Sequence, residues 1–168
     1  MAKRIVVIGH IDHGKTTLIN AINAVYGKEL DTPEGGAKAC VRIGLKQYEF
    51  FDFPGWRDYR ERLKSFDGVL LCVAATDGPM PDTRSMLALC KELGMEKLVI
   101  FLNKMDMVDF EELADLVGEA TVELIAEYGV DTRKCPICRG SAYRAMDDPK
   151  GRWADSIKQL TKIVAKTF

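Results

Sequence analysis

The chain has 168 residues, 47% of them hydrophobic and 29% charged, and its 24 basic and 25 acidic side chains give a net charge of -1. This length predicts a single domain over residues 1–168 with one large core, and the balanced charge gives no overall electrostatic footprint for a nucleic acid. Because no signal peptide or long apolar span is visible, we expect a cytoplasmic protein that does not enter a membrane. Five scattered cysteines argue against a disulfide framework.

The first predicted elements are a buried parallel strand at residues 3–8 (KRIVVI) and a helix over residues 16–26, where apolar residues recur at helical spacing. Between them, residues 9–16 (GHIDHGKT) fit the phosphate-binding template of Gly, four residues, Gly, Lys and Thr. Such a loop wraps backbone N–H groups around phosphates at a helix N-terminus, where the helix dipole favours negative charge. The alternative is a chance match in a tight turn between a strand and a helix.

Each residue type in this loop has its own expected contact with a nucleotide. Lys15 supplies a point charge for the β- and γ-phosphate oxygens, the Thr16 hydroxyl takes one position on a shared Mg²⁺ ion, and Thr17 lies nearest the α-phosphate. Glycine is needed where a side chain would collide with the anion. The residues expected to surround the phosphates with their backbone are Asp12, His13 and Gly14.

A short antiparallel hairpin is predicted next, from residues 39–45 and 46–52, with Gly44 near its turn. Because the two strands are close to each other in sequence, we expect the hairpin at an edge of the sheet. Asp52, at the end of the second strand, can hold Mg²⁺ through a water, and Gly55 allows a backbone N–H to approach the γ-phosphate. The alternative for this Asp-x-x-Gly segment is a plain Pro-Gly turn.

Two continuous apolar segments follow, at residues 68–75 (GVLLCVAA) and 97–102, with a helix predicted between them at residues 82–93. Segments of this kind are typical of parallel strands that are covered on both faces. The alternation of strands and helices predicts an α/β fold around a mostly parallel sheet.

Residues 103–106 (NKMD) stand directly after the second apolar strand. A carboxylate there, on Asp106, can accept the N1–H and N2–H₂ protons of guanine together, whereas adenine offers no such pair of donors. Asn103 would brace the loop and the base edge, and the Lys104 stem would lie across the base plane. Without the phosphate loop, these four residues would suit a helix-capping turn equally well.

The longest helical pattern covers residues 109–128, where Asp109 followed by Glu112 resembles a capping box. A last helix is predicted at residues 154–166. We interpret the apolar stripes of both helices as core packing, with a partner-binding surface as the alternative. The stripe of the first helix is Leu113, Leu116, Val117, Ala120, Leu124 and Ile125. The stripe of the last helix is Ile157, Leu160, Thr161 and Val164.

Residues 135–138 (CPIC) form a short strand candidate that leads into residues 139–142 (RGSA). Backbone N–H groups around Ser141 and Ala142 could reach the carbonyl oxygen of guanine and reject the amino group of adenine, and an ordinary strand exit is the alternative. The two cysteines invite a zinc or redox interpretation. No second ligand pair follows, and the motif does not open a helix, so we interpret them as core or strand thiols.

Taken together, the motifs at residues 9–18, 77–81, 101–106 and 139–142 resemble the nucleotide-binding domain of the translational GTPases, of the elongation factor Tu type. The similarity extends from Lys3 to about Tyr143. It implies a P-loop GTPase fold with a six-stranded, mostly parallel sheet, one antiparallel edge hairpin and helices on both faces. It also implies GTP and GDP as ligands, Mg²⁺ as cofactor, and a nucleotide site that includes Tyr143.

One departure from the family concerns catalysis, for which the resemblance points to Lys15, Gly55 and Trp56. In the elongation factors, the residue after Asp-x-x-Gly is a histidine that positions the attacking water. Indole donates one hydrogen bond and cannot accept a proton as imidazole does, so we expect GTP hydrolysis to be slow. The alternatives are a tryptophan that acts as a hydrophobic gate, and a GTP/GDP sensor or pseudo-GTPase with little or no hydrolysis.

Other departures concern Mg²⁺ and the partners. The segment between Lys15 and Asp52 is shorter than the family pattern, and Thr32 is the candidate for the missing Mg²⁺ ligand, with a plain turn residue as the alternative. We interpret the charged residues 57–64 as a solvated helix face with internal ion pairs, such as Asp58 with Arg62. The alternatives are a regulatory protein partner at the switch regions and an Arg57 that reaches the nucleotide. The family's β-rich domains have no counterpart in the sequence, so we do not expect ribosome or tRNA contacts.

Overall fold

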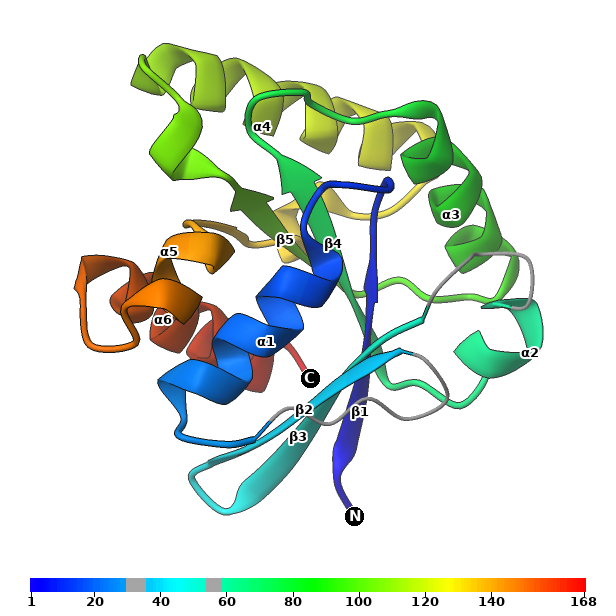
Figure 1. The fold of residues 1–168 in the computed structure, drawn as a ribbon. Helices are drawn as coiled ribbons and strands as arrows, with labels where there is room; N and C mark the ends of the chain where they lie inside the picture. Colours follow the sequence, from blue (N-terminus) through cyan, green and yellow to red (C-terminus); the bar gives the residue numbers. More distant parts are fainter. Residues whose placement is uncertain (30–35, 54–58) are drawn as a thin grey trace.

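The computed structural model describes residues 1–29, 36–53 and 59–168, and six strands form one sheet within them (Figure 1). The order of the strands across the sheet is β2-β3-β1-β4-β5-β6. The strands are β1 (Lys3–Ile8), β2 (Ala37–Ile43), β3 (Lys46–Asp52), β4 (Gly68–Ala74), β5 (Leu98–Asn103) and β6 (Ile137–Arg139).

The sheet is parallel except at one edge. β1 pairs in parallel with β3 and β4, and β5 pairs in parallel with β4 and β6. β2 runs antiparallel to β3 and forms the edge hairpin, with Gly44 and Leu45 between the two strands. The predictions of a mostly parallel α/β sheet and of an antiparallel edge hairpin are therefore confirmed.

Helices cover both faces of the sheet (Figure 1). One face carries α1, α5 and α6, and the other carries α2, α3 and α4. The helices are α1 (Lys15–Val25), α2 (Tyr59–Leu63), α3 (Pro81–Glu92), α4 (Glu111–Glu127), α5 (Ala142–Asp147) and α6 (Arg152–Thr167). Two single 3₁₀ turns are η2 (Met105–Met107) and η3 (Thr132–Lys134).

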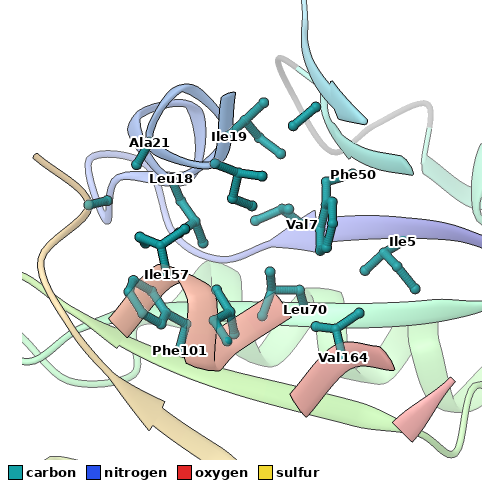
Figure 2. Close-up of a cluster of buried hydrophobic side chains, with 14 of the residues drawn as sticks. Ile5, Val7, Leu18, Ile19, Ala21, Phe50, Leu70, Phe101, Ile157 and Val164 are labelled. Carbon is teal, nitrogen blue, oxygen red and sulfur yellow. The ribbon is translucent and has the colours of Figure 1, made fainter. Parts of the chain in front are cut away.

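The core on the α1 face is built by apolar side chains that alternate along the strands (Figure 2). Val7, Leu70 and Phe101 point from three neighbouring strands toward Leu18 of α1 and Ile157 of α6, and all five are fully buried. Each such side chain contributes about 1.5–3 kcal/mol when removed from water. This packing sets the start of α1 directly above the end of β1, where the glycine-bounded loop lies. The predicted core stripe of α6 is confirmed.

For α4, the predicted capping box is wrong, and the predicted core stripe is confirmed only for Val117, Leu124 and Ile125. Its N-cap is Phe110, and no side chain caps the helix, so the capping box from Asp109 and Glu112 does not form. Leu113 and Leu116 are 42% and 62% exposed, and Ala120 is also exposed. The inner face of the helix includes small residues, and at Gly118 the helix lies close to Leu102 and Ile137 of the sheet. The buried residues are Ala114, Val117, Gly118, Thr121, Leu124 and Ile125.

The cysteine pair is structural. Cys135 and Cys138 are both buried, free, and part of the core clusters on opposite faces of the sheet. Cys138 lies in β6, whereas Cys135 lies before the strand, at the end of η3, so the two thiols pack into separate parts of the core. In the described ranges, no group of three or more His, Cys, Asp or Glu side chains is arranged to hold a metal ion. None of the helices that the structure describes is long and apolar enough to cross a membrane.

Candidate functional site

The loop between β1 and α1 adopts a conformation that its glycines make possible. Gly9 and Gly14 have φ angles of 147° and 91°, a region that side chains disfavour. A Cβ atom on Gly9 would collide with the carbonyl oxygen of Cys72, and one on Gly14 would collide with the Asn103 amide. Because no side chain caps α1, the N–H groups of its first turn remain available to an anion.

The polar side chains at the start of α1 form hydrogen bonds with other groups of the protein. Lys15 Nζ donates to the carbonyl oxygen of His10 at 3.1 Å. Thr16 Oγ1 donates to Oδ2 of Asp52 at 2.5 Å, which joins the helix to the end of β3. The Asp52 side chain is buried, and its other oxygen, Oδ1, has no hydrogen-bond partner in the part of the chain that the structure describes. Burial raises the pKa of the Asp52 carboxyl above its usual range.

These two side chains fit a Mg²⁺ ion. Mg²⁺ prefers hard oxygen ligands and keeps several waters, so a hydroxyl and a single carboxylate beside a phosphate loop form a typical site. The buried Asp52 oxygen without a partner is the kind of group that a cation stabilises. The pKa of Asp52 is raised because burial outweighs the stabilising effects of the Thr16 hydroxyl and the Lys15 charge, and a cation would favour the ionised form.

A second set of loops lies at the ends of β5 and β6. Asn103 is buried and uses both ends of its amide: Nδ2 donates to the carbonyl oxygen of His13, and Oδ1 accepts the N–H of Ala142, each at 2.9 Å. The Met105 N–H donates to the carbonyl oxygen of Gly140 at 3.1 Å. Asn103 therefore joins the phosphate loop to both loops of this edge.

Lys104 and Asp106 turn toward the same cavity. Lys104 has a φ angle of 61°, a left-handed conformation that is uncommon for a residue with a side chain and tends to cluster at functional sites. Asp106 follows in η2, with its carboxylate only 14% exposed. Tyr143 stands at the rim with 58% exposure.

Both sets of loops line one cavity of about 840 Å³. This volume lies within the range of small-molecule binding sites. The predicted site residues that line it are Asp12, Gly14, Lys15, Thr16, Thr17, Asp52, Asn103, Lys104, Asp106, Ser141 and Tyr143. Ala142 is fully buried behind the wall, and the imidazole of His13 does not line the cavity. Thr32, Gly55, Trp56 and Arg57 lie outside the described residues.

His13 is part of the phosphate loop, but its imidazole points into the protein interior. Its side chain is 1% exposed, and Nε2 is 3.5 Å from Oδ2 of Asp77. Burial lowers the pKa of His13 to about 4, so the imidazole is neutral near neutral pH. The residue supports the loop through its carbonyl oxygen, which accepts from Asn103 and Cys72.

Besides Gly9, which belongs to the phosphate-loop motif, five residues of the cavity wall were not predicted as site residues: Ile11, Phe53, Asp82, Met86 and Met107. Ile11 lies inside the phosphate-loop motif and Phe53 directly follows Asp52, so their positions in the sequence could have identified them as site residues. Met86 is buried in α3, and its sulfur accepts the N–H of Gly9 at 3.2 Å. In sequence it has the pattern of an ordinary core residue.

The fold and this cavity define the class of the protein. A parallel sheet carries a glycine-bounded phosphate loop after β1 and an Asn-Lys-x-Asp segment after β5, which is the arrangement of a P-loop GTPase. Residues 37–168 match the family of the elongation factor Tu GTP-binding domain. The chain belongs to this family, and so to the domains that bind GTP and have GTPase function.

Proposed function

We propose that this protein is a Mg²⁺-dependent GTPase that binds GTP and GDP in the cavity between the two sets of loops. The observation that carries the proposal is the common cavity, which has α1 and Lys15 at one end and the half-buried carboxylate of Asp106 at the other. A phosphate and a purine can be held at the same time only if both ends open into one space.

The residues divide by the part of the nucleotide that they would bind. The loop from Gly9 to Gly14, with Lys15 and Thr17, binds the phosphates through N–H groups and one positive charge. Asp106 accepts the two donors of guanine, Lys104 covers the base plane, and Tyr143 and the backbone of Ser141 and Ala142 complete the base site. The Asn103 side chain already holds the loops of this base site together.

Thr16 and Asp52 would hold Mg²⁺, and Thr32 is the candidate for a further ligand. When bound, Mg²⁺ neutralises charge on the β- and γ-phosphates. To receive it, the Thr16 hydroxyl must exchange its present hydrogen bond to Asp52. Asp52 must be ionised, and its burial makes that ionisation less favourable in the absence of a cation.

Hydrolysis should be slow because Trp56 stands where the family pattern has histidine. A water that attacks the γ-phosphate needs a group that accepts from it and orients it, and indole offers only a donor. Gly55 would still contribute its N–H to the γ-phosphate, and Lys15 its charge. Several described residues after Trp56 form surface ion pairs, such as Arg60 with Glu92 and Lys64 with Glu61. A regulatory protein that replaces these pairs could supply the missing group.

Single-turnover cleavage of GTP tests this proposal. We expect Trp56→His to accelerate cleavage by about 100-fold, the usual contribution of a positioned acid or base. Trp153→His is the matched control, since it makes the same exchange on α6, away from the cavity wall. An unchanged rate in Trp56→His would show that Trp56 does not limit hydrolysis.

The second candidate function is a GTP/GDP sensor, which Trp56 and the short segment before Asp52 favour. Phosphate release under excess GTP separates the two functions. More than one phosphate per protein molecule supports the GTPase. Tight binding of GTP and GDP with no phosphate release supports the sensor.

A further inference from the structure

One ion pair beside the cavity has no part in the roles described so far. Arg144 of α5 lies next to Asp106 of η2 at the base end, and its Nε donates to Oδ2 of Asp106 at 3.3 Å. Arg144 is 54% exposed, whereas Asp106 is only 14% exposed. Among the described residues, Asp106 has no other ion pair.

The backbone of Arg144 is fixed close to the base loop. Its N–H donates to the Ser141 hydroxyl at 3.2 Å, in the cap of α5. The next residue along the loop, Ala142, is bonded to Asn103. The guanidinium also lies 5.9 Å from the centre of the Tyr143 ring, at the rim of the cavity. The Arg144 side chain therefore extends from a hydrogen-bonded backbone position to the Asp106 carboxylate.

Each carboxylate oxygen has two lone pairs, so Oδ2 can accept from Arg144 and from a base at once. The last torsion of an aspartate is broad, and a carboxylate held by one bond alone turns easily. Guanine offers two donors, N1–H and N2–H₂, and they are satisfied together only when both oxygens lie in the plane of the base. A fixed donor on Oδ2 limits this rotation.

We infer that Arg144 is a positioning residue for guanine recognition, which holds the Asp106 carboxylate in the orientation that accepts both donors of the base. The inference rests on the proposed function, because it takes Asp106 as the group that reads guanine. Arg144 acts through Asp106 and does not itself contact the nucleotide.

The inference predicts a change in selectivity as well as in affinity. Hypoxanthine lacks the N2 amino group, so inosine diphosphate uses one of the two acceptor positions and depends less on the orientation of the carboxylate. In Arg144→Ala, we expect the preference for GDP over inosine diphosphate to fall by about fivefold, the scale of one exposed charge-assisted hydrogen bond. Arg144→Lys, which keeps the charge but loses the planar fork, should give an intermediate preference.

Calorimetric titration of each variant with GDP and inosine diphosphate, at one Mg²⁺ concentration, measures this ratio. The ratio compares two ligands on the same folded protein, so a partly unfolded sample does not change it. Arg139→Ala is the matched control: it removes an ion pair of the same type, to Asp115, that does not involve Asp106. Its ratio should equal that of the unmodified protein.

The decisive comparison repeats Arg144→Ala in an Asp106→Ala background. If Arg144 acts through Asp106, the second substitution leaves the already reduced ratio unchanged. An unaltered ratio in Arg144→Ala alone, or a further fall in the Asp106→Ala background, overturns the inference. Failure of the proposed function has a different signature, since the unmodified protein would then bind neither diphosphate.

Discussion

The two ends of the cavity differ in how their polar side chains are hydrogen-bonded to the rest of the protein. At the base end, the side-chain amide of Asn103 forms a hydrogen bond through its nitrogen and another through its oxygen, and the Asp106 carboxylate accepts a hydrogen bond from Arg144. At the phosphate end, Thr16 and Asp52 are bonded to each other, and one oxygen of Asp52 has no partner within the described residues.

Because of this difference, we expect base selectivity and Mg²⁺ binding to depend on different conditions. The base end can accept guanine without breaking a described hydrogen bond between its side chains, because Asp106 keeps free lone pairs. The phosphate end must first give up the bond between Thr16 and Asp52, and a buried carboxylate must be ionised. Base selectivity should therefore be built into the free protein, whereas the affinity for Mg²⁺ should depend on pH and on this exchange.

The strongest test of the base end is Asp106→Asn. The amide cannot accept both guanine donors, so we expect GDP affinity to fall by about 100-fold, and xanthosine diphosphate, whose extra oxygen requires a donor, to bind better than GDP. Titration with both diphosphates measures the reversal. Asp109→Asn is the control, because this nearby aspartate is exposed and does not line the cavity. Retained guanine selectivity in Asp106→Asn would mean that Asp106 does not read the base.

The connection between the two ends is tested by Asn103→Ala. The substitution leaves the carbonyl oxygen of His13 without its Asn103 bond and the N–H of Ala142 without a partner, and we expect the free energy of unfolding to fall by about 2 kcal/mol. Denaturant unfolding of the nucleotide-free protein measures this loss.

Asn23→Ala provides the matched control for that measurement. Asn23 is also buried, but its amide is involved in one described bond, from Nδ2 to the carbonyl oxygen of Lys38 at 2.8 Å. We expect its loss to be about half as large. If both variants lose the same free energy of unfolding, the two hydrogen bonds of Asn103 do not stabilise the fold more than the single bond of Asn23 does.

Much of this arrangement could be predicted because the relevant signals are local. A strand, a glycine-bounded loop and a helix follow each other at residues 3–26, and their order alone places phosphate-binding groups at the end of β1. The continuous apolar run of β5 likewise predicts a buried parallel strand with Asn103 at its end. The edge hairpin was found for the same reason, since its two strands are neighbours in sequence.

Other features depend on contacts that sequence periodicity does not record. The periodicity of α4 predicts Leu113 and Leu116 in the core, but the buried face instead includes the small residues Ala114 and Gly118. The Arg144 contact joins two loops that are 38 residues apart. His13 is part of the motif, yet its imidazole is buried under the loop because the chain turns at Asp12, which has a φ angle of 63°.

The smallest predicted effect concerns the phosphate end and is measured without nucleotide or Mg²⁺. The raised pKa of Asp52 means that the folded protein binds a proton more readily than the unfolded chain does. Asp52 therefore destabilises the fold as pH rises through that pKa, and stability recovers as pH falls below it. Asp52→Asn removes the charge, so we expect the variant to be more stable by about 1 kcal/mol near pH 7, an increase of about 2–4 °C in unfolding temperature.

A thermal unfolding series from acidic to neutral pH measures this effect, and the advantage of Asp52→Asn should shrink at the acidic end. Asp67→Asn is the opposite control, because the Arg4 N–H at 2.8 Å and the Lys3 ammonium at 3.2 Å stabilise that carboxylate, and its loss should destabilise the fold. Adding Mg²⁺ and GDP should stabilise the unmodified protein more than Asp52→Asn, since the variant has lost a cation ligand. A less stable Asp52→Asn in metal-free buffer would contradict this account, because the Thr16 bond would then outweigh the burial of the charge.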